Sequence, residues 1–240
     1  MPQLGTSVSF RLSGVIGLQQ RTLQSNIQTR TSSASARSVG RGRTRSYSEM
    51  KQTLTALTVA ATMFANSAAA FDPNDLQKLK DTGDCARCDL SQAMLASTNL
   101  GPTNLRYANL RYANLEGANL TRADLWYADL TRTNLEGANL GDADLEGARL
   151  VDTNLEGANL GGANLEGAYL KTANLKRAYL TNANLRYANL RYADLRYADL
   201  TSANLGGAKL GGADLEGAYL EGAILCNTIM PDGSVIDSGC

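Results

Sequence analysis

The sequence predicts an all-β solenoid built from square coils of about 20 residues, and three features of its spacing support this fold class. Leucine occupies every fifth position from Leu90 to Leu225, which makes 28 consecutive repeats. The residue two positions before each leucine is small, being Ala in most repeats and Thr or Cys in the others. The residue between them is Asn or Asp in most repeats.

Neither a helix nor a straight strand can bury leucines at this spacing. Five residues advance an α-helix by about 500°, so successive leucines would point in all directions around its axis. The side chains of a strand alternate between two faces, so an odd spacing would send successive leucines to opposite sides. A chain that bends through about a right angle every five residues keeps all the leucines inside, and stacked coils then share one core.

The other two repeat positions fit the same geometry. An Ala beside each leucine fills a narrow interior without overpacking it. Asn and Asp side chains that point outward can hydrogen-bond to nearby backbone, which suits a chain that turns a corner every five residues.

The repeated pattern A-[ND]-L-x-x resembles the pentapeptide-repeat family over residues 88–227. This resemblance implies a right-handed quadrilateral β-helix. With four repeats per coil, we expect about seven coils and a rod roughly 34 Å long. Departures from the pattern fall on the outward middle position, at Met94, Arg149, Tyr169, Tyr179, Lys209, Tyr219 and Ile224.

Residues 1–70 and 71–240 carry opposite charges, although the whole chain has a net charge of zero. The first part holds eight basic residues and one acidic residue, a net charge of +7. The second part holds 15 basic and 22 acidic residues, a net charge of −7. Residues 1–48 contain neither Asp nor Glu and are rich in Ser, Thr and Arg, a composition typical of an organelle transit peptide.

Residues 49–70 have the features of a second targeting signal. A lysine precedes an apolar run over residues 54–65, and three alanines at 68–70 form an A-x-A cleavage site. The run is too short to cross a bilayer, so we expect no membrane span after processing. Two targeting signals in tandem most resemble those of proteins that enter the thylakoid lumen of a chloroplast. The mitochondrial intermembrane space is the alternative destination.

Residues 71–87 predict a cap for the first coil. Asp72 can cap a helix that has Pro73 at its first position, and Gly83 can end that helix. We therefore expect a short helix over the open end of the solenoid, where an uncovered edge would stack onto another copy.

Residues 228–240 predict a cap for the last coil. A Pro-Asp-Gly turn at 231–233 lies between two apolar pairs and would fold the chain back over the coil. Two caps favour a monomer. The segments 85–90 and 228–233 are also similar to those of thylakoid-lumen pentapeptide-repeat proteins of plants, algae and cyanobacteria.

The four cysteines lie at the two ends of the expected rod. A disulfide requires Cα atoms within about 7 Å, so only neighbours can pair. We expect Cys226 to pair with Cys240 and tie the cap to the last coil. Cys85 and Cys88 can form a structural disulfide, remain buried thiols or act as a redox pair. Zinc is excluded because the chain has no histidine and too few ligands, and we expect no cofactor.

The absence of histidine excludes Ser-His, Cys-His and His-metal arrangements. Glu116, Glu136 and Glu156 would align in successive coils, but they would lie on a convex surface without a pocket. We therefore expect no enzymatic activity.

Basic and aromatic residues on the outside of the coils are the candidate functional residues. An Arg-Tyr pair on each of three consecutive sides of one coil predicts a protein interface. Its residues are Arg186, Tyr187, Arg191, Tyr192, Arg196 and Tyr197. Duplication of repeats would also generate this pattern without selection for binding, and both interpretations remain open. A second group is expected to form an aromatic ladder that stiffens the coils, and it contains Arg106, Tyr107, Trp126 and Tyr127.

These observations predict a rigid, non-enzymatic scaffold of the thylakoid lumen that binds an unidentified protein partner. One alternative is a thiol-redox protein that uses Cys85 and Cys88. Another is a DNA mimic that binds DNA gyrase, as some pentapeptide-repeat proteins do. Charge disfavours the mimic, because duplex DNA of roughly 34 Å carries about 20 negative charges, whereas residues 88–227 carry 16 acidic and 12 basic residues. We expect no nucleic-acid partner.

Overall fold

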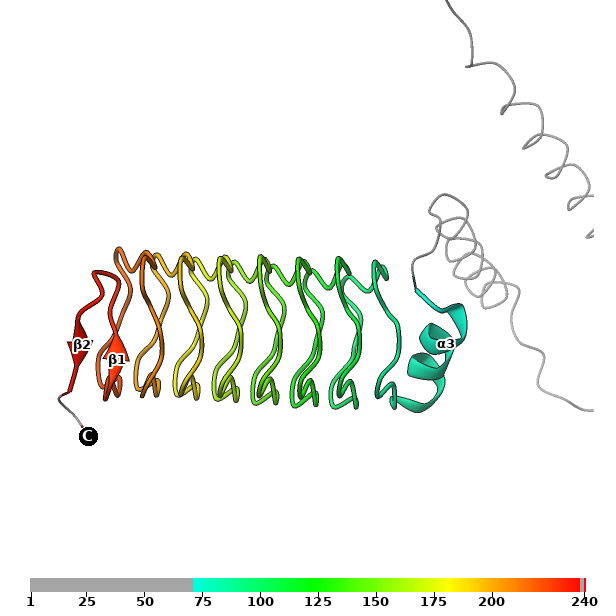
Figure 1. The fold of residues 1–240 in the computed structure, drawn as a ribbon. Helices are drawn as coiled ribbons and strands as arrows, with labels where there is room; N and C mark the ends of the chain where they lie inside the picture. Colours follow the sequence, from blue (N-terminus) through cyan, green and yellow to red (C-terminus); the bar gives the residue numbers. More distant parts are fainter. Residues whose placement is uncertain (1–70, 238–239) are drawn as a thin grey trace, which may run out of the picture. The chain divides into compact units, whose positions relative to one another are not determined.

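The computed structural model describes residues 71–237 and Cys240, and coils stacked in single file fill most of that range (Figure 1). The two targeting segments predicted within residues 1–70 lie outside the described residues. Parallel bridges join residues that are 20 apart, from Asp84 with Asn104 to Lys209 with Ile229. The predicted coil length of 20 residues is therefore confirmed.

One continuous apolar core runs through the coils. From Leu105 to Leu210, every leucine of the repeat is at most 1% exposed. Buried threonines replace alanine in two of these repeats, and their hydroxyls are satisfied. Thr133 and Thr153 donate from Oγ1 to the carbonyls of Leu110 and Leu130, each at 2.7 Å. The small inward position thus accepts a hydroxyl only because a backbone carbonyl lies beside it.

Each corner is a β-turn that begins at the core leucine. At one such corner the carbonyl of Leu105 accepts a hydrogen bond from the N–H of Ala108 at 3.0 Å. The third residue of the turn lies at positive φ in most corners, as with Tyr107 at 57° and Gly117 at 60°, and the corner after Leu100 instead has a cis peptide bond before Pro102. Glycine adopts this conformation freely, whereas other residues do so at some cost.

The outward Asn and Asp side chains support the corners, as the sequence predicts. Oδ1 of Asn139 accepts from the backbone N–H of Gly141 at 3.1 Å. These amides also join neighbouring coils, since Nδ2 of Asn154 donates to Oδ1 of Asn134 at 3.1 Å. The repeat's middle position therefore stabilises both the turn and the stack.

Helix α3 spans Pro73–Thr82 at the N-terminal end of the coils (Figure 1). Its N-cap is Asp72, whose Oδ1 accepts from the N–H of Asn74 at 2.8 Å. Gly83 ends the helix at φ 66°, and its N–H donates to the carbonyl of Leu79. Leu76 and Leu79 are buried and belong to the same core as the coils.

Asp72 and Asp75, at the start of α3, form hydrogen bonds with the first coil. Oδ2 of Asp75 accepts from the backbone N–H of Asp89 at 2.7 Å. The backbone N–H of Asp72 donates to the carbonyl of Asp89 at 3.1 Å. The helix therefore supplies hydrogen-bond partners to the backbone of the first coil.

The ladder of bridges extends one repeat beyond each end of the predicted range 88–227. At the N-terminal end, Asp84 forms a bridge and Cys85 takes the buried position that leucine occupies elsewhere. At the C-terminal end, Ile229 forms a bridge and Met230 stands five residues after Leu225. A cysteine and a methionine replace leucine in these repeats, which hides them from a search for leucine alone.

A short antiparallel pair lies at the C-terminal end of the rod. Strand β1 spans Thr228–Ile229 and strand β2 spans Val235–Ile236. Thr228 lies opposite Ile236. The N–H of Met230 donates to the carbonyl of Ser234 at 2.8 Å, and the turn between them contains Gly233 at φ 87°. The Pro-Asp-Gly segment thus reverses the chain.

The β1–β2 pair covers the last coil only in part. Leu215, Leu220 and Leu225 are partly exposed, unlike the equivalent leucines inside the rod.

Among the described residues, no helix has the length and apolar character needed to cross a bilayer.

Candidate interaction surface

Three corners of one coil carry an Arg-Tyr pair, and we call these six residues the Arg-Tyr band. They are Arg186, Tyr187, Arg191, Tyr192, Arg196 and Tyr197. Each tyrosine of the band is the third residue of a turn and has a φ between 58° and 60°. The three tyrosines share the same backbone conformation, so their Cα–Cβ bonds leave the rod in the same way at each corner.

The next coil carries a glycine opposite each tyrosine of the band. Gly207, Gly212 and Gly217 follow the three tyrosines by 20 residues. A Cβ atom added to any of these glycines would lie 2.5 to 2.6 Å from the nearest atom of the ring. Each ring therefore packs against glycine backbone. Between 47% and 58% of each tyrosine remains exposed, so the band presents a fixed aromatic surface.

Two arginines of the band have no acidic partner among the residues that the structure describes. Arg186 donates from Nη2 to the hydroxyl of Tyr187 at 3.3 Å, and its guanidinium lies 5.2 Å from the ring centroid. The guanidinium of Arg191 lies 5.7 Å from the ring centroid of Tyr192. Within the part of the chain that the structure describes, neither arginine forms a salt bridge. Both guanidinium groups can therefore donate hydrogen bonds to a carboxylate of another molecule.

Arg196 differs because acidic side chains surround it. It donates from Nε and Nη2 to the two carboxylate oxygens of Asp194, at 2.8 and 2.6 Å. A second carboxylate, that of Asp214, lies 3.6 Å from Nε. These hydrogen bonds raise the pKa of Arg196 and lower the pKa of Asp194. The band is therefore cationic on two sides, whereas the sequence predicts three equivalent sides.

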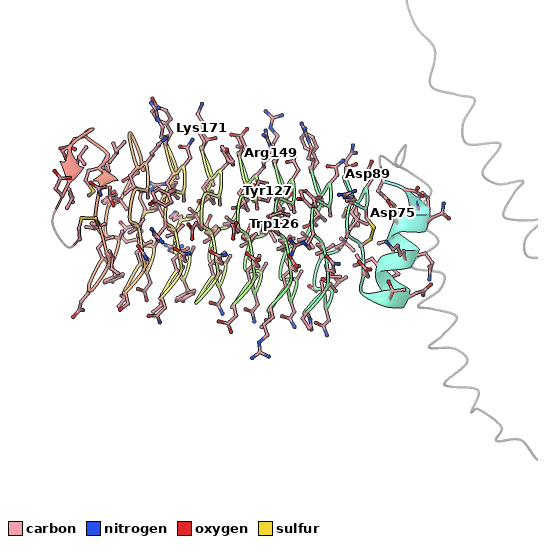
Figure 2. All side chains as sticks on the ribbon, turned by 60° about the horizontal axis from the view of Figure 1, so that its bottom comes forward. Asp75, Asp89, Trp126, Tyr127, Arg149 and Lys171 are labelled. Carbon is pink, nitrogen blue, oxygen red and sulfur yellow. A yellow bond between two sulfur atoms is a disulfide. The ribbon has the colours of Figure 1, made fainter. Side chains whose placement is uncertain are left out.

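The predicted aromatic ladder lies nearer the N-terminal end of the rod, where Figure 2 shows Trp126 and Tyr127 side by side. Tyr107 and Tyr127 are stacked with centroids 6.0 Å apart, and Trp126 meets both rings edge-on. The guanidinium of Arg106 lies 4.3 Å from the Trp126 ring and forms a salt bridge with Asp124 at 3.0 Å. These contacts are satisfied within the rod, which favours a structural role.

A further column of side chains, which the sequence motifs do not predict, contains Tyr112, Arg132, Asp152 and Thr172. Arg132 donates from Nη1 to the Tyr112 hydroxyl at 3.2 Å and pairs through Nε with Asp152 at 3.3 Å. Asp152 also accepts from the hydroxyl of Thr172. The hydrogen bond from Arg132 lowers the pKa of Tyr112, and the bond from Thr172 lowers the pKa of Asp152. The members are 20 residues apart, so pairing residues at the coil length would have found the column.

The structure places both predicted cysteine pairs at disulfide-bonding distance. Cys85 and Cys88 have Cα atoms 5.2 Å apart, and Cys226 and Cys240 have Cα atoms 5.0 Å apart. The first two are 0% and 2% exposed. Burial keeps that pair away from a protein that would exchange thiols with it.

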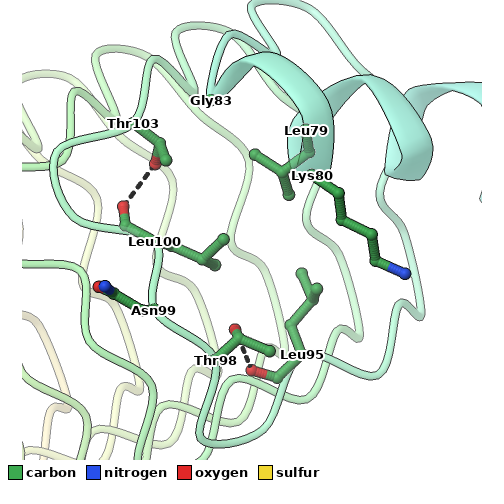
Figure 3. Close-up of a pocket in the computed structure, with 8 residues that line it drawn as sticks. All are labelled: Leu79, Lys80, Gly83, Leu95, Thr98, Asn99, Leu100 and Thr103. Atoms are coloured by element: carbon green, nitrogen blue, oxygen red, sulfur yellow. Dashed lines mark hydrogen bonds between the residues drawn. The ribbon is translucent and has the colours of Figure 1, made fainter. Parts of the chain in front are cut away.

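A hollow of about 320 Å³ lies where helix α3 meets the first coils (Figure 3). Leu79, Leu95 and Leu100 line it. The hydroxyls of Thr98 and Thr103 donate to backbone carbonyls at 2.6 Å, so neither is directed at a ligand. The hollow is an imperfection in the packing beneath the helix and has no group of converging polar atoms that would mark a binding site.

The described residues contain no set of side chains that could hold a metal ion. Glu116, Glu136 and Glu156 each accept a hydrogen bond from an asparagine of the next coil, at 3.2 to 3.4 Å. These carboxylates therefore brace the coil surface.

A sequence model of the family described as pentapeptide repeats matches the chain in eight copies. The matched segments are residues 84–122, 102–137, 138–177, 173–212 and 203–231, which together cover more than half of the chain. No curated protein matches the chain at a significant level.

Several solved structures are similar to the chain. HetL, a pentapeptide-repeat protein involved in regulation of heterocyst differentiation in the cyanobacterium Nostoc sp. strain PCC 7120, is 36% identical; the match covers 64% of this chain and 85% of HetL, with a TM-score of 0.24. AT2G44920, from the Arabidopsis thaliana thylakoid lumen, is 34% identical over 39% of this chain and 66% of that protein, with a TM-score of 0.37. QnrB1, a plasmid-mediated fluoroquinolone resistance protein, is 17% identical over 58% of this chain and 80% of that protein, with a TM-score of 0.25.

Proposed function

The chain belongs to the pentapeptide-repeat family, and from this premise we propose that it is a non-catalytic rod that binds a protein partner through the Arg-Tyr band. The observation that carries the proposal is the contrast among the arginines of the band. Arg186 and Arg191 form no salt bridge within the described residues, whereas Arg196 is neutralised by two aspartates. Cations that lack a partner beside half-exposed tyrosine rings favour an interface with a carboxylate-bearing surface.

The rigidity of the band supports the same proposal. The three tyrosines lie at positive φ and against glycines, so partner binding would freeze few side-chain rotations. Duplication of repeats explains why Arg-Tyr pairs and turn glycines recur, and the glycines at 207, 212 and 217 leave room for the three rings.

The test of the interface compares tyrosines from different parts of the rod. A Tyr187→Ser, Tyr192→Ser variant changes the band, and a Tyr169→Ser, Tyr179→Ser variant changes two other exposed tyrosines as a matched control. Tagged full-length chains would be used to recover partners from an extract of the compartment, and quantitative mass spectrometry would compare them. We expect the band variant to lose at least about tenfold of its main partner, which is about 1.4 kcal/mol, while the control retains it. Equal recovery by the two variants would rule the band out as the interface.

We further propose the thylakoid lumen as the compartment. The leader composition supports this address, as does the 34% identity to AT2G44920. An import assay with isolated chloroplasts would test it. The processed protein should be protected from protease until the thylakoid membrane is opened. Digestion as soon as the inner envelope membrane is opened would contradict a location in the lumen.

We also propose that the rod has about seven coils, is capped at both ends and is a monomer. Helix α3 and the β1–β2 pair support the two caps. Light scattering on the purified full-length chain would test the oligomeric state, and a mass of twice the chain's 25.5 kDa would contradict it.

Neither alternative function gains support. Cys85 and Cys88 are buried, which disfavours their thiol exchange with another protein. The repeats hold 16 acidic and 12 basic residues, a net charge far smaller than that of duplex DNA of the same length, which disfavours a DNA mimic that binds gyrase.

A further inference from the structure

The second disulfide differs from the first in its exposure. Cys240 is exposed at the surface and Cys226 is half-buried, whereas Cys85 and Cys88 are 2% exposed or less. Thiol–disulfide exchange requires an incoming thiolate to reach one of the sulfur atoms. Of the two pairs, only the one formed by Cys226 and Cys240 meets this condition.

A hollow of about 330 Å³ adjoins this disulfide. Its walls are formed by both cysteines and by Arg186, Asn204 and Asn227, among others. A hollow of this size beside the bond gives an approaching side chain room.

The hollow has an amide and a guanidinium among its lining residues, two groups that would stabilise a thiolate on Cys226. Nδ2 of Asn227 donates to Sγ of Cys226 at 3.3 Å. Arg186 lines the same hollow and forms no salt bridge within the described residues. A hydrogen-bond donor and a nearby cation both lower the free energy of a thiolate, which makes its sulfur a better leaving group.

We propose that the disulfide of Cys226 and Cys240 is an exchange site for a protein dithiol. A thiolate of the dithiol attacks Sγ of Cys240 and forms a mixed disulfide. The original S–S bond breaks, and its electron pair stays on Cys226 as a thiolate, which takes a proton from solvent. The second thiol of the partner then attacks the mixed disulfide, releases reduced Cys240 and leaves the partner oxidised.

The exchange would loosen the C-terminal cap. The disulfide closes a segment that contains β1 and β2, each of two residues. Strand β1 is held in the ladder by its bridge to Lys209, whereas the pairings of the described residues join β2 only to β1. Reduction therefore removes the covalent tie on β2 at the end of the rod, where Leu225 and Met230 are already partly exposed. This inference does not depend on the proposed interface or on the proposed compartment.

The first test measures the reduction of both pairs in the folded protein. The full-length chain suits it because it has only these four cysteines. The chain would be exposed to dithiothreitol or to a purified thioredoxin, quenched with an alkylating reagent, and analysed by peptide mass spectrometry. We expect Cys226 and Cys240 to be alkylated at least about tenfold faster than Cys85 and Cys88. Equal rates, or faster reduction of the N-terminal pair, would overturn the proposal.

A second test examines the leaving group. Asn227→Gly removes the amide donor and suits the φ of 56° at this position. Arg186→Gln removes the cation. We expect each change to slow the exchange at Cys226 and Cys240 by about threefold to tenfold, without an effect on the other pair. Mere loosening of the cap would instead speed reduction, so an unchanged or faster rate contradicts the role of these residues.

A trapping experiment identifies the sulfur that is attacked. A thioredoxin that lacks its second cysteine cannot complete the exchange and holds the mixed disulfide. Peptide mapping should find it joined to Cys240. A cross-link to Cys226 would reverse the proposed roles of the two sulfur atoms and contradict the assignment.

Discussion

The ring of Tyr187 lies against the backbone of Gly207, one coil further along the rod, where an added Cβ atom would be only 2.6 Å from the ring. Gly207 also has a φ of 70°, which disfavours any residue with a side chain. The glycine therefore meets two separate demands, one from its own turn and one from its neighbour.

A Gly207→Ala substitution should destabilise the rod through both effects. The positive φ costs about 1 kcal/mol, and turning the half-exposed ring away from its rotamer adds about 0.5 to 1.5 kcal/mol. The matched control is Gly137→Ala, because Gly137 has a φ of 61° and nothing within 4 Å of its added Cβ. Urea unfolding should show the larger loss for Gly207.

A double-substitution cycle separates the two contributions. In a Tyr187→Ala background the clash is absent, so Gly207→Ala should cost no more than the control does. If the cost in that background stays as large as before, the ring contact does not explain the glycine.

The contact between α3 and the first coil gives a second prediction. Asp75→Ala leaves the N–H of Asp89 without its side-chain acceptor, which should cost about 1 to 3 kcal/mol. Figure 2 shows the two residues facing each other across this junction. Hydrogen exchange should reveal a much faster Asp89 amide, whereas Asp81→Ala, on the same helix, should leave that amide protected. If the Asp89 amide stays equally protected in the Asp75 variant, this hydrogen bond does not hold α3 to the first coil.

The sequence predicts the coil because the five-residue spacing of the leucines can be seen within any short stretch of the chain. Leucine can recur at this period only if the chain closes into coils, so Leu90 to Leu225 were sufficient for the fold class. The short helix followed equally from local signals at Asp72, Pro73 and Gly83, and α3 begins and ends beside them.

The surface could be predicted less well because it depends on relations between coils. The tie from Asp75 to Asp89 and the contact of Tyr187 with Gly207 join residues whose pairing no local pattern records. Reading residues 20 apart would have recovered the second relation but not the first. The different states of Arg186 and Arg196 also depend on neighbours, since only Arg196 has an aspartate within reach on both sides.

The depth of the core along the rod gives a third prediction. Leu150→Ala removes a fully buried side chain, and such changes cost about 2 to 5 kcal/mol. Leu220 occupies the same repeat position in the last coils but is partly exposed. The same substitution at Leu220 should therefore cost less than about 2 kcal/mol. Equal losses in urea unfolding would mean that the C-terminal end is as well covered as the middle.

The pair formed by Asp194 and Arg196 predicts how stability responds to acid. Hydrogen bonds from Arg196 lower the pKa of Asp194 in the folded state, so the unfolded chain binds a proton more readily than the native one. This contribution to stability is complete above about pH 4 and is lost as the pH falls through the lowered folded pKa. The melting temperature should then change little from pH 7 to pH 5 on account of this pair and fall below pH 4. Asp194→Asn and Arg196→Gln should each flatten the acid part of the curve, and combining them should flatten it no further. A curve that keeps its full acid slope in both single variants would show that this pair does not contribute.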